Sequence, residues 1–260
     1  MDTLPSLFVS HGSPMLALED GPARSFLVQL GQTLGRPRAV VVFSAHWEAP
    51  GPLVTAAPRP GTIHDFYGFP AALHAMRYPA PGDPVLAGEV ARRLQGAGLP
   101  AGLDAARGLD HGAWVPLSLM FPKADVPVVQ VSIDPGLGPA YHLRLGEAMR
   151  PLRSDGILVV GSGSATHNLR ELHWGDPGAA PPDWVTDFAE WLSAAVEAGD
   201  ADALLAWRET APHALRNHPT DEHLLPLFCA LGARTAGQAG RRLHTSHTYG
   251  ALAMDVYAFD

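Results

Sequence analysis

Three short runs of mainly apolar and β-branched residues most constrain how this chain can fold. They occupy Ala39–Phe43, Val126–Ile133 and Ile157–Val160, and such runs are typical of parallel strands that are covered on both faces. Before and between them, Gly21–Leu34 and Asp83–Gly98 carry apolar residues at helical spacing. We therefore predict an α/β fold, in which helices pack on the faces of a central, mostly parallel or mixed sheet.

The same alternation continues along the rest of the chain. Patches rich in Pro and Gly interrupt it, but apolar patterning resumes directly after each patch. We interpret these patches as surface loops, and we predict that residues 1–260 form a single domain. The further predicted elements are a strand at Leu7–Val9, helices at Gly138–Leu152, Trp184–Ala198, Ala201–Arg208 and from Pro219 to about Leu231, and a hairpin between Arg241 and Phe259.

Composition excludes several classes of protein. The chain has 18 Lys and Arg against 26 Asp and Glu and a formal net charge of −8, so we expect no basic surface for a nucleic acid. Cys229 is the one cysteine, which rules out an intramolecular disulfide and a cysteine-rich zinc site. Met1–Pro5 lacks a cationic segment, and no run approaches the roughly 20 apolar residues of a membrane helix. We therefore expect a cytoplasmic protein that binds no membrane.

Three of the 13 histidines follow directly on predicted strands. They are His11, His46 and His167, and ligands of open α/β sheets bind outside the carboxyl ends of the strands. One histidine at a strand end is more often a hydrogen-bonded structural residue. Three together, each beside Gly- or Ser-rich backbone that permits close approach, favour a functional site at one rim of the sheet.

A fourth candidate is His223, which we place in the first turn of a helix with Thr220 as its N-cap. From there its side chain can reach the rim of the sheet. We interpret the neighbouring Glu222 as compensating the helix dipole, because adjacent helical residues point about 100° apart and would not face one metal. His218 is a weaker candidate because Pro219 favours an extended turn there.

Two loops offer further candidates. In one, Asp110 precedes His111 and could orient its imidazole or raise its basicity, in a loop before a helix that starts near Trp114. In the other, His64–Pro70, several aromatic side chains could stack on a planar ring. The spacing of the aromatic residues in His64–Pro70 is equally typical of an ordinary packed loop.

A set of imidazoles at one rim favours a transition metal. Histidine binds zinc, iron, copper or nickel, whereas magnesium and calcium prefer oxygen ligands. Three protein ligands leave coordination positions open for chemistry, and further histidines would be free for proton transfer at neutral pH. Spacing alone leaves open whether such a site hydrolyses a substrate at zinc or activates oxygen at iron.

Six motifs stand in order along nearly the whole chain: His11-Gly12-Ser13-Pro14, Ser44-Ala45-His46-Trp47, Thr62-Ile63-His64-Asp65-Phe66-Tyr67-Gly68-Phe69-Pro70, Asp110-His111-Gly112, His167-Asn168-Leu169 and Glu222-His223-Leu224-Leu225-Pro226-Leu227. Together they resemble the 4,5-DOPA extradiol dioxygenase family, which belongs to the class III extradiol ring-cleaving dioxygenases. The resemblance implies an enzyme that opens the ring of a DOPA-like catechol, with that catechol and O2 as its small-molecule partners.

The resemblance also implies roles for individual residues. His11, His46 and His223 match metal ligands, and His167 matches an active-site histidine that serves as a fourth ligand or as the acid/base. His111 matches a second histidine that contacts substrate or oxygen. The candidate substrate-binding residues are Asp65, Tyr67, Phe69 and Trp47.

The resemblance implies one divalent metal ion per chain, Fe(II) for dioxygenase activity or Zn(II) as isolated. Related class III enzymes use a glutamate as the third ligand, whereas the pattern here has His223, and a neutral ligand leaves the metal more electrophilic. Two alternatives stay open: a zinc-dependent hydrolase at the same open site, and a non-enzymatic metal-binding or interaction protein on this scaffold. The physiological catechol, the position of ring cleavage and the formation of a homodimer also stay open.

Overall fold

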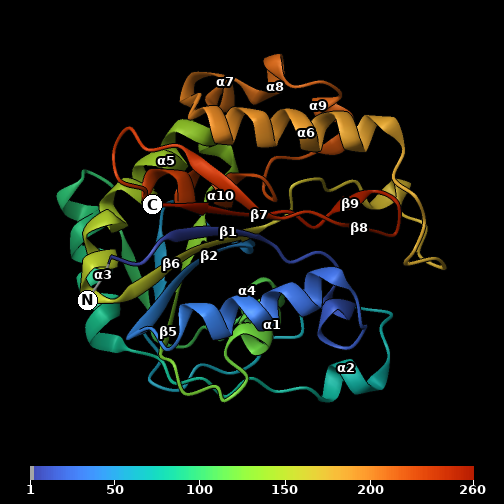
Figure 1. Cartoon of the computed structure of the whole chain (residues 1–260). Helices are drawn as coiled ribbons and strands as arrows, with labels where there is room; N and C mark the ends of the chain where they lie inside the picture. Colours follow the sequence, from blue (N-terminus) through green and yellow to red (C-terminus); the bar gives the residue numbers. More distant parts are fainter. Residues whose placement is uncertain (1–2) are drawn as a thin grey trace.

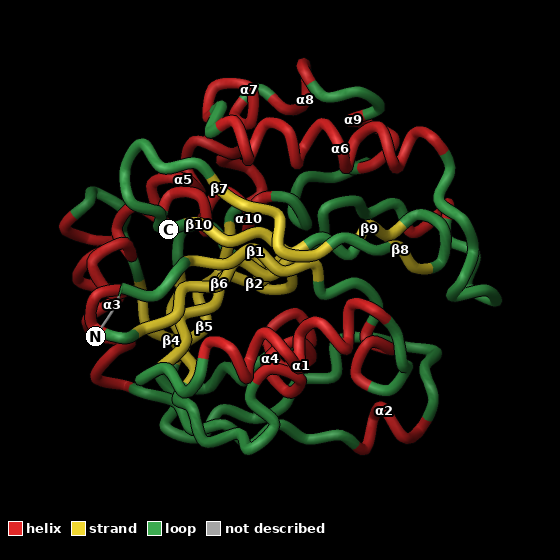
Figure 2. Tube along the Cα trace, in the orientation of Figure 1, coloured by secondary structure: helices red, strands yellow, loops and turns green. Residues whose placement is uncertain are grey.

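A mixed β-sheet forms the centre of the molecule (Figures 1 and 2). The computed structural model describes residues 3–260. The sequence predicts no secretory signal at Met1–Pro5, and Met1 and Asp2 of that segment lie outside the described residues. The strands within that range are β1 (Ser6–Ser10), β2 (Ala39–Glu48), β3 (Leu53–Thr55), β4 (Gly102–Asp104), β5 (Val128–Ile133), β6 (Ile157–Gly163), β7 (Gly240–His244), β8 (His247–Thr248), β9 (Leu252–Ala253) and β10 (Val256–Phe259).

The main sheet has the strand order β4-β3-β5-β2-β6-β1-β10-β7. Its four central strands, β5, β2, β6 and β1, are parallel to one another, whereas β3 runs antiparallel to β5, and β10 runs antiparallel to both β1 and β7. The predicted mixed α/β sheet is thus confirmed. The predicted C-terminal hairpin is present as the β7–β10 pair, and the segment between these strands holds a small ladder of β8 with β9.

Helices cover both faces of the sheet (Figure 1). Val40 and Val42 of β2 pack toward one core, with α1 and α4, while Val41 and Phe43 pack toward the other, with α3, α5, α6 and α10. Because both faces are covered, the strand is apolar at every position, and this is the pattern that predicts it from the sequence. The helices are α1 (Pro22–Leu34), α2 (Ala71–Ala75), α3 (Pro84–Gly96), α4 (His111–Met120), α5 (Gly138–Met149), α6 (Asp183–Ala198), α7 (Ala201–Leu205), α8 (Trp207–Thr210), α9 (Ala214–Asn217) and α10 (Leu225–Gly232).

Three predicted helices differ from the structure, and one of them is α4, which begins at His111 and not near Trp114. The helix predicted at Ala201–Arg208 is divided into α7 and α8 at Ala206, and Trp207, the first residue of α8, is completely buried in the core. The helix predicted to begin after Pro219 begins only at Leu225. The reason is Pro226, which has no N–H to donate and is therefore accommodated in the first turn of a helix, not in its interior.

No helix described within residues 3–260 is both long and apolar enough to cross a membrane. The helices nearest the carboxyl ends of the parallel strands, α4 and α10, are instead short and buried in the protein. Together with the loop that follows β1, they enclose the rim at which the candidate histidines lie.

Candidate metal centre

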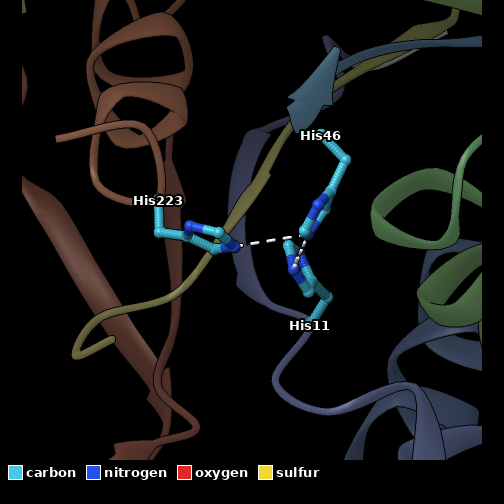
Figure 3. Close-up of side chains that lie close together, drawn as sticks. All are labelled: His11, His46 and His223. Carbon is cyan, nitrogen blue, oxygen red and sulfur yellow. Dashed lines mark hydrogen bonds between the residues drawn. The ribbon is translucent and has the colours of Figure 1, made fainter. Parts of the chain in front are cut away.

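Three histidines from distant parts of the chain meet at the carboxyl end of the sheet (Figure 3). His11 directly follows β1, His46 lies near the end of β2, and His223 lies two residues before α10. The Nε2 atom of His46 is 3.0 Å from Nε2 of His11 and 3.2 Å from Nε2 of His223. One ring nitrogen from each of the three side chains lies within 4.8 Å of those from the other two.

The hydrogen-bonding partners of His11 determine which of its nitrogens carries the proton. Nδ1 of His11 is 3.0 Å from Oγ of Ser162, and Ser162 in turn bonds the carbonyl oxygen of Gly112. A carbonyl can only accept, so the Ser162 hydroxyl donates its proton there and must accept the Nδ1–H of His11. Nε2 of His11 therefore presents a lone pair to the cluster.

A proline in α4 makes this carbonyl available. Gly112 lies four residues before Pro116, which has no N–H to complete the helical hydrogen bond to that oxygen. The freed carbonyl of Gly112 accepts from Ser162 instead. Gly112 is also required for space, because a Cβ there would collide with Oγ of Ser44 and crowd the ring of His46.

His223 is oriented in the same way by an adjacent carboxylate. Its Nδ1 lies 2.9 Å from Oε1 of Glu222, which accepts the Nδ1–H and leaves the Nε2 lone pair facing the cluster. The expectation that neighbouring side chains would diverge here, with Glu222 serving a helix dipole, is wrong. Residues 219–224 form turns and not a helix, so the angle of about 100° between adjacent helical residues does not apply.

The three Nε2 atoms that face one another therefore cannot all be paired by hydrogen bonds. His11 and His223 both direct an Nε2 lone pair at Nε2 of His46, and a neutral imidazole can donate a single proton from that atom. Burial, followed by the neighbouring imidazoles, lowers the pKa of His11 and of His223 well below the usual range of histidine, so protonation does not resolve the conflict. A cation at the centre would resolve it.

The distances agree with a shared transition-metal ion. A metal holds imidazole nitrogens at about 2.1 Å, which places two of them roughly 3.0 Å apart at a right angle and about 3.4 Å apart in a tetrahedron. The two measured separations, 3.0 and 3.2 Å, fall within this range. The donor set of three neutral nitrogens suits iron or zinc and not magnesium or calcium.

His111 and Asp65 form a second pair beside the cluster. The ring of His111 lies 3.9 Å from that of His46, measured between centroids, and its Nδ1 is 3.0 Å from Oδ1 of Asp65. Oδ2 of Asp65 is 3.7 Å from Nδ1 of His46. Although partial burial opposes ionisation, the hydrogen bond and the charge of His111 hold the pKa of Asp65 at about 2.

Asp110 does not have the predicted role of orienting His111. Its carboxylate caps α4 at Ala113, accepts a hydrogen bond from Ser44 at 2.7 Å and pairs with Arg107 at 3.2 Å. The helix consequently begins at His111 itself, not near Trp114. The partner of His111 is Asp65, which lies 46 residues away in the sequence.

His167 lies against His223. The two rings are nearly parallel, at 10°, with centroids 3.3 Å apart. Burial, and then the proximity of His111, lower the pKa of His167 to about 4. One nitrogen of His167 groups with His223 and Glu222, and His167 is not in the group formed by His11, His46 and His223. His167 therefore stands beside the three converging nitrogens and faces the cavity in front of them.

A cavity of about 660 Å³ opens onto these side chains. Four of the histidines line it, whereas His11 lies beneath them and is 1% exposed. Phe69 lines the cavity as predicted for a substrate wall, and Tyr67 stands at the mouth with 91% of its surface exposed. The other lining residues are Gly12–Met15, Glu19, Asp65, Phe66, Gly68, Pro70, Leu169, Trp174, Tyr249 and Leu252.

Trp47 is not among the residues that line the cavity. It follows His46 in a strand, where successive side chains point to opposite faces, and its ring lies 4.8 Å beneath the guanidinium of Arg107. The prediction that it helps to form the substrate wall is therefore corrected. Phe66 and Trp174, which do line the cavity, were not singled out, and no spacing or motif in the sequence distinguishes Trp174.

Two other histidines that were considered near the site belong to the packing around it. His64 bonds the carbonyl of Met76 at 3.0 Å. His218 is fully buried and bonds the carbonyl of Ala165 at 2.9 Å. Neither lines the cavity.

The chain is similar over nearly its whole length to proteins of one family. The family model described as the catalytic LigB subunit of aromatic ring-opening dioxygenase matches residues 5–259. A Beta vulgaris protein named 4,5-DOPA dioxygenase extradiol is 40% identical, over 98% of this chain and 96% of its own. An Escherichia coli K12 protein of the same name is 45% identical, over 88% and 85% respectively.

A further relative and a solved structure agree with this match. The protein named dioxygenase tasH from Hapsidospora irregularis is 34% identical, over 100% of this chain and 86% of its own. The crystal structure of an uncharacterized Escherichia coli K12 protein superposes with a TM-score of 0.82 at 36% identity, covering 98% of this chain and 99% of that one. The chain therefore belongs to the LigB family of aromatic ring-opening dioxygenases and is a ring-cleaving dioxygenase.

Proposed function

We propose that His11, His46 and His223 bind one divalent metal ion through their Nε2 atoms, at the centre of a dioxygenase that opens the ring of a catechol between a hydroxylated carbon and its unhydroxylated neighbour. The observation that carries the proposal is the convergence of two Nε2 lone pairs on a third imidazole nitrogen at 3.0 and 3.2 Å. A single N–H of His46 cannot satisfy the lone pairs of both His11 and His223, whereas a cation bound by all three Nε2 atoms would.

We propose Fe(II) as the active metal and Zn(II) as an ion that fills the same site without supporting oxygen chemistry. Fe(II), when bound, supplies the redox chemistry that spin-paired organic substrates need to react with O2. Three neutral ligands leave the site with a net positive charge, which favours the binding of a catechol as an anion. The protein thus has to remove a hydroxyl proton from the substrate.

His167 is the proposed acceptor of that proton. It lines the cavity beside His223, and its pKa, lowered to about 4 mainly by burial, keeps the ring neutral at pH 7. A neutral imidazole can act as a base, and the positive charge that it gains is balanced by the negative charge left on the catechol. Asn217 helps to hold it in place, because its carbonyl accepts from the backbone N–H of His167 at 2.9 Å.

His111 is the proposed donor of a proton to oxygen as the ring opens. Asp65 lies 3.0 Å from its Nδ1 and is ionised, with a pKa of about 2. A carboxylate beside one ring nitrogen orients the imidazole, which leaves Nε2 of His111 to pass a proton to oxygen. Asp65 thereby acts on the reaction by orienting His111.

The proposed substrate is a catechol with a side chain, as the names of the relatives suggest for those proteins. The cavity of about 660 Å³ is larger than a single catechol ring requires, and Phe66 and Phe69 offer aromatic surface beside the histidines. The mouth is bordered by Tyr67, Leu169 and Trp174, which are 91%, 51% and 50% exposed. A side chain on the ring would extend toward this mouth.

The test is oxygen uptake by protein that has been loaded anaerobically with Fe(II) and then given DOPA and a panel of simpler catechols. We expect one O2 consumed for each ring opened, a product that absorbs visible light, and no uptake by the Zn(II) form. No uptake with any catechol would overturn the proposal. Hydrolysis of esters or amides by the Zn(II) form without oxygen would favour a hydrolase instead.

A further inference from the structure

The charged side chains that line the cavity are of one sign. Besides the histidines, the lining contains two carboxylates, Glu19 and Asp65, and no Lys or Arg among the residues that the structure describes there. Asp65 is already engaged by His111 and His46. Glu19 therefore offers the carboxylate that is available to a bound molecule.

Glu19 is held by a single side chain from the C-terminal part of the molecule. The hydroxyl of Tyr249 donates to Oε2 of Glu19 at 2.6 Å. Among residues 3–260, this is the one hydrogen bond found for the side chain of Glu19, and Oε1 is left available. Burial, and then the bond to Glu19, raise the pKa of Tyr249 well above its usual value, so the phenol stays a donor throughout the physiological range.

The backbone of Tyr249 supports a specific role for this contact. Its φ is +52°, a left-handed conformation that bulky residues rarely adopt. Gly250 follows with φ +75°, so the pair forms a tight turn between β8 and β9. The carbonyl of Tyr249 accepts from the backbone N–H of His173, and its own N–H donates to Pro177. The turn thus places a buried phenol at the wall of the cavity, against Glu19.

We propose that Glu19, positioned by Tyr249, binds a protonated amine on the side chain of the catechol, so that this enzyme prefers catechols with a cationic side chain to catechols with an acidic one. The inference rests on the proposed function, since it concerns the substrate of the same site. An ammonium would donate to Oε1 while Oε2 keeps its bond to Tyr249. A carboxylate in its place would meet Glu19, and no Lys or Arg among the described residues that line the cavity would compensate it.

Binding to the Zn(II) form, measured by calorimetry without oxygen, tests the preference directly. The probes are dopamine, which carries an amine, 4-methylcatechol, which is neutral, and 3,4-dihydroxyphenylacetate, which carries an acid. A hydrogen bond between two charged groups supports a difference of roughly tenfold or more in Kd. We expect dopamine to bind about tenfold more tightly than 4-methylcatechol, and the acid to bind most weakly. Equal affinities, or tighter binding of the acid, would overturn the inference.

Variants assign the preference to Glu19. Glu19→Gln keeps the shape and removes the charge, so the advantage of dopamine should fall to about twofold or less while the affinity for 4-methylcatechol stays the same. Tyr249→Phe should reduce the advantage by a smaller factor, because Glu19 keeps its charge but loses its anchor. The matched control is Asp20→Asn, whose carboxylate is fully exposed and does not line the cavity; it should bind all three probes as the unaltered protein does.

Oxygen uptake with the neutral probe separates this inference from the function on which it rests. If the Fe(II) form does not open 4-methylcatechol, dopamine or DOPA, the proposed function fails. If it opens 4-methylcatechol and shows no preference for dopamine, and Glu19→Gln changes nothing, the function stands and the role of Glu19 is wrong. A loss of 4-methylcatechol turnover in Glu19→Gln would also contradict it, because that probe has no amine for Glu19 to bind.

Discussion

The buried histidines of this protein form two groups that differ in what their Nε2 atoms meet. His142 is representative of the first group: Nδ1 bonds the carbonyl of Gly138 at 2.6 Å, and Nε2 accepts from the backbone N–H of Asp134 at 3.2 Å. In the second group, His11 and His223 have the same tautomer, with a proton on Nδ1. Their Nε2 atoms, however, face another imidazole and not a backbone donor.

Burial and pKa do not separate these groups. His142, at 0% exposed, is as buried as the site histidines, and burial lowers its pKa to about 4. His218 is also fully buried, with its pKa lowered to about 3 by the same cause. The difference lies in the second nitrogen of each ring. His142 has partners at both nitrogens, and His218 bonds a carbonyl through Nε2 while its Nδ1 has no partner among the described residues. In neither does Nε2 face another imidazole, and that feature marks His11 and His223 as candidate ligands.

The largest expected effect is the loss of the metal when a ligand is removed. His11→Ala deletes one of three lone pairs, and we expect metal affinity to fall on the order of a hundredfold or more, since a metal site gains several kcal/mol from each ligand. Metal content after dialysis against a chelator measures this. His142→Ala is the control and should keep one metal per chain. Retention of a full metal complement by His11→Ala would break the distinction between the two groups.

A smaller effect is expected at His167, which lies beside the ligands without sharing their geometry. His167→Ala should keep the metal and lose about 10²- to 10⁴-fold in turnover, the usual range for a missing acid/base. Steady-state oxygen uptake together with metal analysis separates the two quantities. Should metal and turnover decline in parallel, His167 would be a fourth ligand.

Removing the residues that set the histidine tautomers should lower the metal affinity less than removing a ligand does. Ser162→Ala removes the acceptor for Nδ1 of His11, and Glu222→Ala removes the acceptor for Nδ1 of His223. Loss of such partners lowers metal affinity by roughly 10- to 100-fold. Competition with a zinc chelator measures the change, with Glu89→Ala on the surface of α3 as the control. Unchanged affinity in both variants would show that the ring orientations are set by packing alone.

The smallest effect concerns stability, and it belongs to the first group. The pKa of His142 is about 4 in the folded protein and near 6.5 in the unfolded chain. The unfolded chain therefore binds the proton first, and the stability contributed above pH 6.5 is lost as the pH falls toward 4, by about 1.4 kcal/mol per pH unit at most. Denaturant unfolding between pH 7 and 4 should show a shallower decline for His142→Gln. Identical slopes would show that His142 titrates alike in both states.

Much of the fold could be predicted from local sequence. Consecutive positions of β6 and of the first half of β2 are apolar because helices cover both faces of the sheet. Such a run of apolar residues can be recognised within a few positions of the sequence. The second half of β2 carries Ser44, His46 and Glu48 and does not show that pattern. The insertion of β10 between β1 and β7 depends on pairing between opposite ends of the chain, which no local pattern records.

The start of α10 shows a signal that was present in the sequence and overlooked. Pro226 requires the helix to begin close to it. Thr220, Asp221 and Glu222 also resemble a helix start, and for this reason the helix is predicted to begin too early in the sequence. This error also led to the wrong interpretation of Glu222, because a turn lets neighbouring side chains meet where a helix would separate them.

By itself, the sequence determined that histidines would follow the ends of buried parallel strands, because strand burial and strand direction are local properties that bring those ends to one rim. Only the tertiary structure decided which nitrogens face one another. His46 and His223 are 177 residues apart, and the acceptor for Nδ1 of His11 is 151 residues from it. The direction of an imidazole lone pair is set by the partner of its other nitrogen, and that partner is supplied by folding.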